Sequence, residues 1–301
     1  MLSAIMIFLA SLVFPGIIIR TKSILSGRKG PSIFLPLYDV LRLLRKGAVY
    51  SRNTTFLFTL APTVNLACVV VACLVIPFGH NGSFISFDGD FVVFAYLLAL
   101  GRFLSIAASL EVGSSFEGMG ANREALFGAI VEPAFFIIMG SFSLLTGYTS
   151  FSDIFTSINY ESYTAYILGG LAAYAFAVIA LVENSRMPVD DPKTHLELTM
   201  IHEVMILDNS GYDLGQILYT GYLKFALFGA IIANFFIAGL SPYLGIPLFF
   251  AIQFGFAVIV GIAESFIARF RMSHNPQFIF TLSSIAILIF IGVLLMAEKI
   301  A

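Results

Sequence analysis

Eight apolar runs, each long enough to cross a bilayer, divide this chain of 301 residues. A helix rises about 1.5 Å per residue, so roughly 20 apolar residues cover a hydrocarbon core about 30 Å thick. Because backbone polar groups must be satisfied internally in lipid, runs of this length predict helices. The predicted spans are Leu2–Ile19, Phe56–Phe78, Phe91–Leu110, Ala125–Gly147, Tyr163–Val182, Ile217–Leu240, Ile246–Ala268 and Gln277–Met296.

Lysine and arginine gather in the connections on one side of these spans. The chain has 16 such residues, and 13 of them fall in connections that follow odd-numbered spans. The opposite side has only Lys299, while Arg102 and Lys224 fall within spans. Because cytoplasmic connections carry an excess of basic residues, this asymmetry places the basic side in the cytoplasm and predicts that both termini lie outside.

The composition agrees with a chain that is mostly embedded in lipid. Hydrophobic residues make up 59% of the chain, charged residues 11%, and the mean hydropathy is +0.95, which excludes an ordinary soluble domain. No repeat divides the chain, so we expect an all-α, polytopic protein with a single integral membrane domain over residues 1–301. Cys68 and Cys73, the only cysteines, fit small buried packing residues, and two thiols are too few for an iron–sulfur cluster.

Charged side chains within the spans are the strongest functional signal, because a charge at such depth costs a few kcal/mol or more. Arg102, Glu132, Lys224 and Glu264 are expected about 6–12 Å below the inner surface, and no Asp, Glu, Lys or Arg falls in the outer half of a span. This pattern predicts a charged cavity open to the cytoplasm, from which an ion would leave sideways toward a neighbouring subunit. The candidate ion-coupling residues are Glu132, Arg102, Glu183, Lys224, Glu264, Glu111 and Glu117.

A structural role remains an alternative for the same charges. Buried ion pairs, Arg102 with Glu132 and Lys224 with Glu264, would also account for them without any movement of ions.

Two cytoplasmic segments have patterns of their own. Residues Ile33–Lys46 place apolar side chains at helical spacing opposite charged ones, which predicts an amphipathic helix on the inner surface that serves either as a lipid anchor or as a docking site. Residues 183–216 form a long acidic cytoplasmic loop with seven acids and two bases, which suits a docking surface or a proton-collecting funnel. His195 and His202 in this loop could share a helical face, but a zinc site would need further ligands.

Three cytoplasmic segments resemble a known family. They are GRKGPSIFLPLYDVLRLLRK at Gly27–Lys46, GMGANREALFGAIVEPAF at Gly118–Phe135 and ENSRMPVDDPKTHLELTMIHEVMILDNSG at Glu183–Gly211. The chain resembles the membrane subunit shared by NADH:quinone oxidoreductase (complex I, subunit 1) and the membrane-bound nickel–iron hydrogenases. The HLELTMIHE stretch at His195–Glu203 favours the hydrogenase branch, the formate hydrogenlyase subunit 4-like proteins.

The resemblance implies a subunit of a prokaryotic cytoplasmic (inner) membrane complex, placed where a cytoplasmic redox arm meets the membrane arm. It implies no cofactor bound by this chain, with nickel–iron and iron–sulfur centres in hydrogenase-like and iron–sulfur subunits on the cytoplasmic face, and antiporter-like subunits in the membrane. Glu132 matches the family's acid in the fourth span. The expected cytoplasmic interface comprises Asp39, Arg42, Arg123, Glu124, Asp190, Asp191, Glu197, Glu203 and Asp208.

Two positions depart from the family pattern. Leu35 stands where the family usually has Gln before the first-loop proline, and Asp208-Asn209-Ser210-Gly211 replaces EYSG. These departures argue against a quinone pocket but keep the acids. We therefore expect an anchor and ion-coupling subunit of a hydrogenase-like complex that moves protons or sodium. The alternatives are a quinone-site subunit of a complex I type enzyme, a stand-alone secondary transporter and a purely structural anchor.

Overall fold

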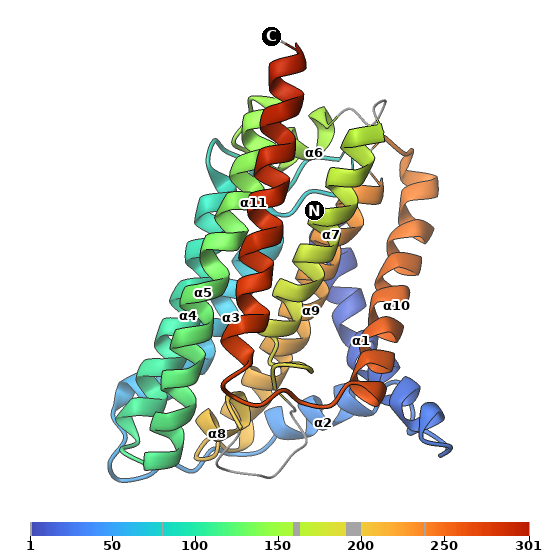
Figure 1. The fold of residues 1–301 in the computed structure, drawn as a ribbon. Helices are drawn as coiled ribbons and strands as arrows, with labels where there is room; N and C mark the ends of the chain where they lie inside the picture. The colour runs from blue at the N-terminus through green and yellow to red at the C-terminus, as the bar shows by residue number, and fades with distance from the viewer. Residues whose placement is uncertain (1, 80, 159–162, 191–199, 238, 301) are drawn as a thin grey trace.

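The computed structural model describes residues 2–79, 81–158, 163–190, 200–237 and 239–300, which form helices and connections (Figure 1). Eight of the helices are long and apolar enough to cross a membrane. The helices are α1 Leu2–Leu25, α2 Leu35–Leu44, α3 Phe56–Val75, α4 Asp90–Glu111, α5 Ser115–Thr146, α6 Phe151–Ser157, α7 Tyr163–Glu183, α8 His202–Met205, α9 Gly211–Ile237, α10 Pro242–Phe266 and α11 Asn275–Ile300.

The eight predicted spans are confirmed as helices, and the main differences lie at the ends predicted to be cytoplasmic. Helix α5 begins at Ser115 rather than Ala125, and α9 begins at Gly211 rather than Ile217. These first turns carry polar residues, so an apolar run underestimates the helix where it leaves the lipid. The short helices α6 and α8 have no apolar run of their own and were not predicted.

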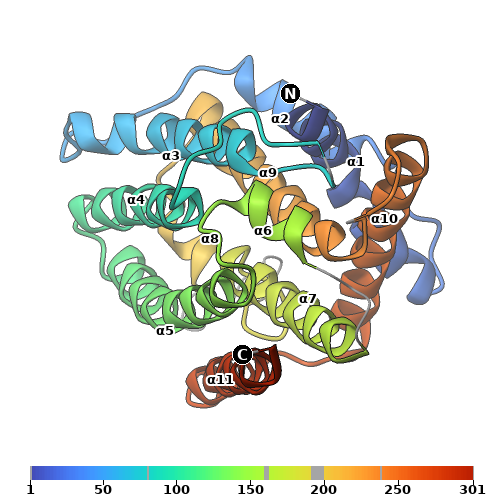
Figure 2. The same ribbon diagram turned by 90° about the horizontal axis from the view of Figure 1, so that it is seen from above.

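Helix α9 forms the centre of the bundle, as the view from above shows (Figure 2). It packs against α1, α2, α3, α7 and α10. In its most apolar stretch of 18 residues, 83% is buried, compared with 28% in the corresponding stretch of α11 at the periphery. Small residues permit this close approach, because Ala175 and Ala180 on α7 and Ala226, Ala230 and Ala233 on α9 are almost completely buried.

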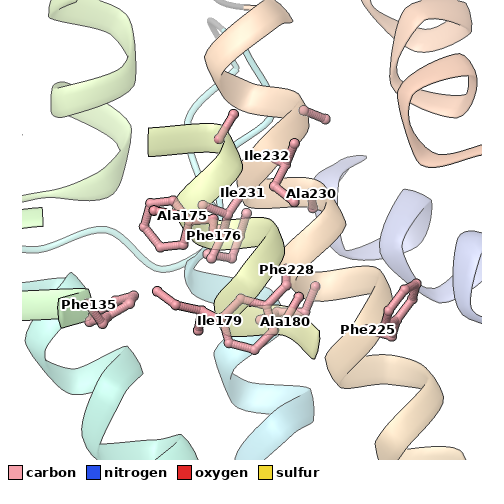
Figure 3. Packing of buried hydrophobic residues seen from close by; sticks show 14 of the residues in the cluster. Phe135, Ala175, Phe176, Ile179, Ala180, Phe225, Phe228, Ala230, Ile231 and Ile232 are labelled. Atoms are coloured by element: carbon pink, nitrogen blue, oxygen red, sulfur yellow. The ribbon is translucent and has the colours of Figure 1, made fainter. Parts of the chain in front are cut away.

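Aromatic rings fill the space between α9 and its neighbours, as the close view shows (Figure 3). Phe94 of α4 stacks on Phe135 of α5 with ring centroids 5.7 Å apart, and its edge contacts Phe228 of α9. Phe176 of α7 contacts both Phe135 and Phe235 at 5.9 Å. Rings at these separations attract one another beyond simple burial, so this cluster fixes the rotation of the helices that carry the charges described below.

The outer end of the bundle contains a buried acid that the sequence did not indicate. Asp90 immediately precedes the predicted span Phe91–Leu110, but it is the first residue of α4 and is fully buried. It accepts hydrogen bonds from the Phe151 backbone N–H at 2.7 Å and the Ser150 hydroxyl at 3.0 Å. Asp90 therefore caps α6, which lies across the outer end of the bundle (Figure 2).

The predicted amphipathic helix is confirmed as α2, which lies across one end of the bundle, the end that also holds α8 (Figure 1). Pro36 and Val40 are buried where α2 packs on α1 and α9, whereas Phe34, Tyr38 and Leu41 are exposed. One side of α2 is thus part of the bundle, and the other offers apolar surface, as a helix in the headgroup plane does.

The orientation of the chain can be tested with single introduced cysteines. Cys68 and Cys73 are buried, so they should not react in the folded protein, whereas Arg28 and Asp88 are exposed at opposite ends of the bundle. We expect a membrane-impermeant maleimide to label Asp88→Cys in intact cells and to label Arg28→Cys only after the cells are broken. Labelling of Arg28→Cys in intact cells would show that the predicted orientation is inverted.

Candidate functional site

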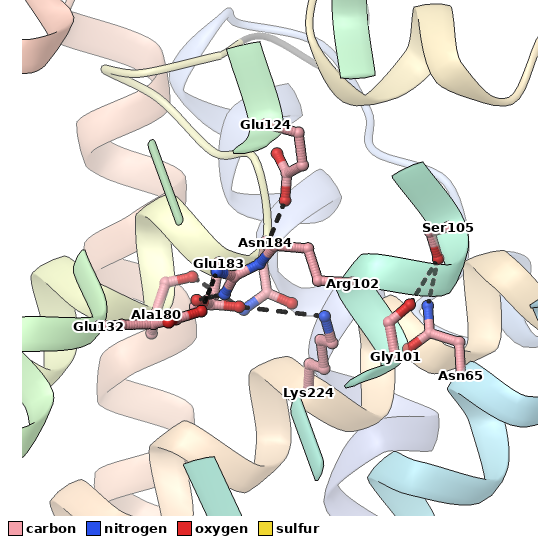
Figure 4. Close-up of polar contacts among 10 residues, drawn as sticks. All are labelled: Asn65, Gly101, Arg102, Ser105, Glu124, Glu132, Ala180, Glu183, Asn184 and Lys224. Carbon is pink, nitrogen blue, oxygen red and sulfur yellow. Dashed lines mark hydrogen bonds and ion pairs between the residues drawn. The ribbon is translucent and has the colours of Figure 1, made fainter. Parts of the chain in front are cut away.

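Arg102 of α4 is the centre of a buried ionic network (Figure 4). Its side chain is 8% exposed, and it contacts carboxylates from two other helices. Nη1 donates to Glu132 Oε1 at 2.8 Å, Nη2 donates to Glu183, and Nε lies 3.8 Å from Glu124 Oε1. Glu124 and Glu132 belong to α5 and Glu183 ends α7, so one guanidinium joins three helices.

Helix α5 is built to receive this guanidinium. Glu124, Gly128 and Glu132 are four residues apart, so they lie one above another on a single face of the helix. A Cβ atom at Gly128 would overlap the Arg102 guanidinium. The spacing therefore produces two carboxylates with a gap between them, and the arginine lies in the gap.

Lys224 of α9 adds a second cation to the network. Its Nζ is 3.9 Å from Glu183 Oε2, which is beyond hydrogen-bond distance, so the attraction is electrostatic. With Arg102 and Lys224 opposed by Glu124, Glu132 and Glu183, the network has two positive and three negative groups when all are ionised. One carboxylate is thus available to hold an additional proton or cation.

Glu183 lies between two cavities. The larger has a volume of about 250 Å³, and its walls include Asn65, His202 and Lys224 as well as Glu183. The smaller, about 20 Å³, lies between α4, α5, α7 and α9 and is lined by Arg102, Glu132 and Glu183. Since the Glu132 side chain is 41% exposed, charged groups extend from the larger cavity to the side of the bundle.

Glu264 is separate from this network, so the pairing of Lys224 with Glu264 considered from the sequence is wrong. The fully buried carboxylate of Glu264 contacts Lys22 of α1 at 2.8 Å and Arg186 at 3.2 Å. The lysine and the glutamate were placed at similar depth by counting, but depth does not fix the direction in which each helix turns its side chain. The pairing of Arg102 with Glu132 is confirmed.

Asp190 holds the base of the acidic loop. Its Oδ1 contacts Arg269 Nη2 at 2.8 Å, and its Oδ2 accepts hydrogen bonds from the backbone N–H groups of Ile201 and His202, both at 3.2 Å. One buried carboxylate thus joins two parts of the acidic loop, Asp190 and residues 201 and 202, to the connection between α10 and α11. Asp191 and Glu197, which were also expected at the interface, lie outside the described residues.

Several other predicted residues fasten connections to helix ends. Glu111 accepts a hydrogen bond from the Thr55 backbone N–H, and Glu117 Oε1 accepts one from the Asp208 backbone N–H at 3.2 Å. Glu117 is nearly fully buried, whereas Asp208 is exposed. These two glutamates lie outside the Arg102 network, and each contacts the backbone of a connection.

The remaining interface candidates divide between surface and interior. Asp39 and Arg42 form an exposed pair at 3.9 Å on α2, of the kind that contributes little stability. Arg123 donates to the Met200 carbonyl at 2.9 Å and so contacts the acidic loop. Glu203 lines the larger cavity. Glu124, expected at the interface, instead belongs to the Arg102 network.

Four residues of these sites were missed from the sequence. Lys22, Arg186 and Arg269 were counted only as cytoplasmic charges that orient the chain, although each pairs with a buried carboxylate. Asn65 of α3 donates to Ser105 at 3.1 Å and lines the larger cavity. A polar amide within an apolar span was the signal that could have identified Asn65.

His202 is a polar group of the larger cavity that is held neutral. Burial, followed by the positive charge of Lys224, lowers the pKa of the imidazole to about 4, and Asp190 opposes this shift. Among the described residues, no group of three His, Cys, Asp or Glu side chains gathers in a way that could hold a metal ion.

Fold and site together define a polytopic membrane protein with a buried ionic network and a cavity near one end of the bundle. The chain belongs to the NADH dehydrogenase family, whose pattern matches residues 1–296. It is 24% identical to formate hydrogenlyase subunit 4 of Escherichia coli, over 98% of this chain and 97% of that protein. It is 26% identical to hydrogenase-4 component C of the same organism, over 80% and 74% of the two chains.

More distant relatives and a solved structure extend this comparison. The chain is 27% identical to NADH-quinone oxidoreductase subunit 8 of Thermus thermophilus, over 73% of this chain and 62% of that protein. Its fold is similar to a chain in the structure of the membrane-bound sulfane sulfur reductase, an archaeal respiratory membrane complex, with a TM-score of 0.82 and 19% identity over 97% of each chain. The predicted resemblance and the eight-helix membrane fold are confirmed.

The close approach of Arg102 to α5 predicts an unusual sensitivity at Gly128. We expect Gly128→Ala to lower the free energy of unfolding by about 1–3 kcal/mol, because the methyl group would displace the guanidinium. The matched control is Gly140→Ala on the same helix, where a Cβ meets nothing within 4 Å and should be neutral or stabilising by up to about 1 kcal/mol. Thermal unfolding in detergent measures both, and equal melting temperatures would contradict the packing argument.

The depressed pKa of His202 predicts an acid-sensitive stability. Because the unfolded histidine titrates near 6.5 and the folded one near 4, stability is complete above about pH 6.5 and falls as the pH drops toward 4. We expect the free energy of unfolding of His202→Gln to fall by about 1–3 kcal/mol less than that of wild type over this pH range. The partial exposure of the ring keeps this difference small. Unfolding at pH 7, 6 and 5 tests this, with the exposed His274→Gln as control; parallel curves for wild type and His202→Gln would refute it.

Proposed function

We propose that this chain is the membrane anchor and ion-coupling subunit of a hydrogenase-like oxidoreductase complex of a prokaryotic cytoplasmic membrane. In this role it links electron transfer on the cytoplasmic side to the movement of protons or sodium. The proposal is supported by the names of the relatives above and by one observation in this chain: a charged network that extends from an inner cavity to a half-exposed carboxylate, Glu132.

The proposed route begins at the larger cavity and ends at Glu132. An ion or proton that reaches the cavity near Lys224 meets Glu183, which also contacts Arg102. Arg102 stays charged and contacts Glu132 as well, so it can hold one carboxylate while the other exchanges its proton or cation. Glu132 then delivers the ion sideways to a membrane neighbour. Because the three acids share Arg102, their titrations are coupled, and a change at one alters the others.

The driving event in this proposal is a change of charge on the cytoplasmic face. Reduction of a centre in a partner subunit would alter the potential at the acidic loop, whose base is held by Asp190. Nickel–iron and iron–sulfur centres would belong to hydrogenase-like and iron–sulfur subunits, and the receiving membrane neighbour would be an antiporter-like subunit. Asp39 and Arg42 on α2, together with Asp208, offer exposed polar contacts for such cytoplasmic partners.

A quinone-site subunit of a complex I type enzyme is the second candidate. The larger cavity favours it, since about 250 Å³ with a mainly apolar lining could take a ring-sized ligand. Asn209, one of the residues that departs from the family pattern, lines this cavity. Inhibition of the complex by quinone-site inhibitors would favour this candidate over the first.

The first proposal predicts that Glu132 is required for ion movement but not for assembly. In Glu132→Gln, Arg102 keeps Glu124 and Glu183 as partners, so we expect the complex to assemble and to transfer electrons. Ion uptake into inverted vesicles, measured per electron transferred, should fall at least about tenfold, because the neutral amide cannot take up a proton or hold a cation.

The control for this experiment is Asp153→Asn. Asp153 is an exposed carboxylate at the outer end of the bundle, distant from the network, so its loss should leave both rates unchanged. Normal ion uptake in Glu132→Gln would contradict the coupling role. Loss of assembly in Glu132→Gln would indicate that the network is structural.

A further inference from the structure

A third pocket, separate from the two cavities beside Glu183, lies at the end of α1 and the end of α10. It has a volume of about 350 Å³, and its lining includes Lys22, Ser23, Ser26, Arg28, Ser265 and Phe266. None of these residues belongs to the Arg102 network, and of the residues that line this pocket only Ile19 also lines the larger cavity. The pocket combines cations, hydroxyls and apolar side chains, so it can contact a ligand that has both a charged part and a greasy part.

The end of α1 is folded so that Arg28 returns to this pocket. The Gly27 N–H donates to the Ile24 carbonyl at 3.0 Å, and the Arg28 N–H donates to the Ser23 carbonyl at 2.9 Å. Gly27 has a φ of +71°, the left-handed conformation in which a glycine ends a helix and reverses the chain. This local turn is what places Arg28 beside Ser23 and Ser26.

The pocket has an excess of positive charge. Lys22 and Arg186 share the single carboxylate of Glu264, which leaves that group with one positive charge in surplus. Arg28 is exposed, and no ion pair to it is recorded among the described residues. Since Lys22 Nζ donates to Glu264 through only one of its three hydrogens, it can still donate to an anion.

Exposed apolar side chains line the pocket, as Leu25 and Phe266 do, or stand beside it in the chain, as Ile24 does. Ile24 and Leu25 on α1 are 62% and 44% exposed, and Phe266 at the end of α10 is 76% exposed. Exposed aliphatic and aromatic side chains next to basic ones at the end of membrane helices match the boundary between acyl chains and headgroups.

We propose that this pocket binds the headgroup of an anionic phospholipid of the inner leaflet, with the phosphate contacted by Arg28 and Lys22 and the acyl chains against Ile24, Leu25 and Phe266. The hydroxyls of Ser23 and Ser265 donate to the carbonyls of Ile19 and Gly261 at 2.9 and 2.7 Å, so their lone pairs are left to accept hydrogen bonds. A headgroup that carries its own hydroxyls, such as that of phosphatidylglycerol, satisfies these acceptors.

The test is a lipid titration of the full-length chain in a neutral detergent, followed by native mass spectrometry. Wild type should bind phosphatidylglycerol at least about tenfold more tightly than phosphatidylcholine. Arg28→Gln should lose about tenfold in affinity for phosphatidylglycerol, the size expected for one charge-assisted hydrogen bond. Because Arg28 is exposed, this change should not disturb folding, which thermal unfolding of the same sample confirms.

The matched control is Arg52→Gln, another exposed arginine on the cytoplasmic side that does not line the pocket. It should bind phosphatidylglycerol like wild type. Equal losses in both variants, or equal binding of the two lipids, would overturn the proposal. Displacement of phosphatidylglycerol by millimolar inorganic phosphate alone would also overturn it, because the pocket would then recognise a free anion rather than a lipid. None of these outcomes depends on whether Glu132 couples ion movement.

Discussion

The burial of the Arg102 guanidinium is the constraint on which the rest of this structure depends. A cation that cannot lose its proton must find anions when it leaves water, and the side chain that is 8% exposed finds Glu124, Glu132 and Glu183. These carboxylates come from α5 and α7, so the electrostatic requirement also determines which helices must be adjacent. Gly128 supplies the space, and the aromatic cluster around Phe94 and Phe135 packs toward the outer side of the same helices.

Buried charged residues gather at one end of the bundle. Asp90, at the opposite end, is an exception with a structural explanation. At the end that carries Arg102, charged groups contact one another across helices and line cavities, the arrangement on which the proposed ion route rests. At the outer end, Asp90 is buried but accepts hydrogen bonds from Ser150 and the Phe151 backbone, where it holds α6 in place. Because the Asp90 carboxylate caps α6, we do not include it in the proposed ion route. The absence of a charged path through the outer half therefore persists despite Asp90, within the part of the chain described.

The sequence was sufficient for the long helices and for one ion pair, but not for the other partners of the charged side chains. Apolar runs found all eight long helices, since lipid permits few alternatives to a continuous helix. Counting also gave Arg102 and Glu132 similar depth, and they do pair. Counting failed for Lys224 and Glu264, because the partner of a side chain depends on the rotation of its helix, which tertiary packing sets. The network role of Glu124 was missed because α5 extends beyond its apolar run, and hydropathy does not indicate this extension.

The short segment after α7 connects sites that would otherwise be independent. Glu183, the last residue of α7, belongs to the Arg102 network, Arg186 contacts Glu264, and Asp190 contacts Arg269, so three residues close together in the chain pair with different parts of the bundle. A partner that displaced the acidic loop would move Asp190 first and would then strain the Arg186 and Glu183 contacts, since only a few residues separate them. The segment thus provides a physical connection from the cytoplasmic surface to Glu183, at the point where the proposed ion route begins.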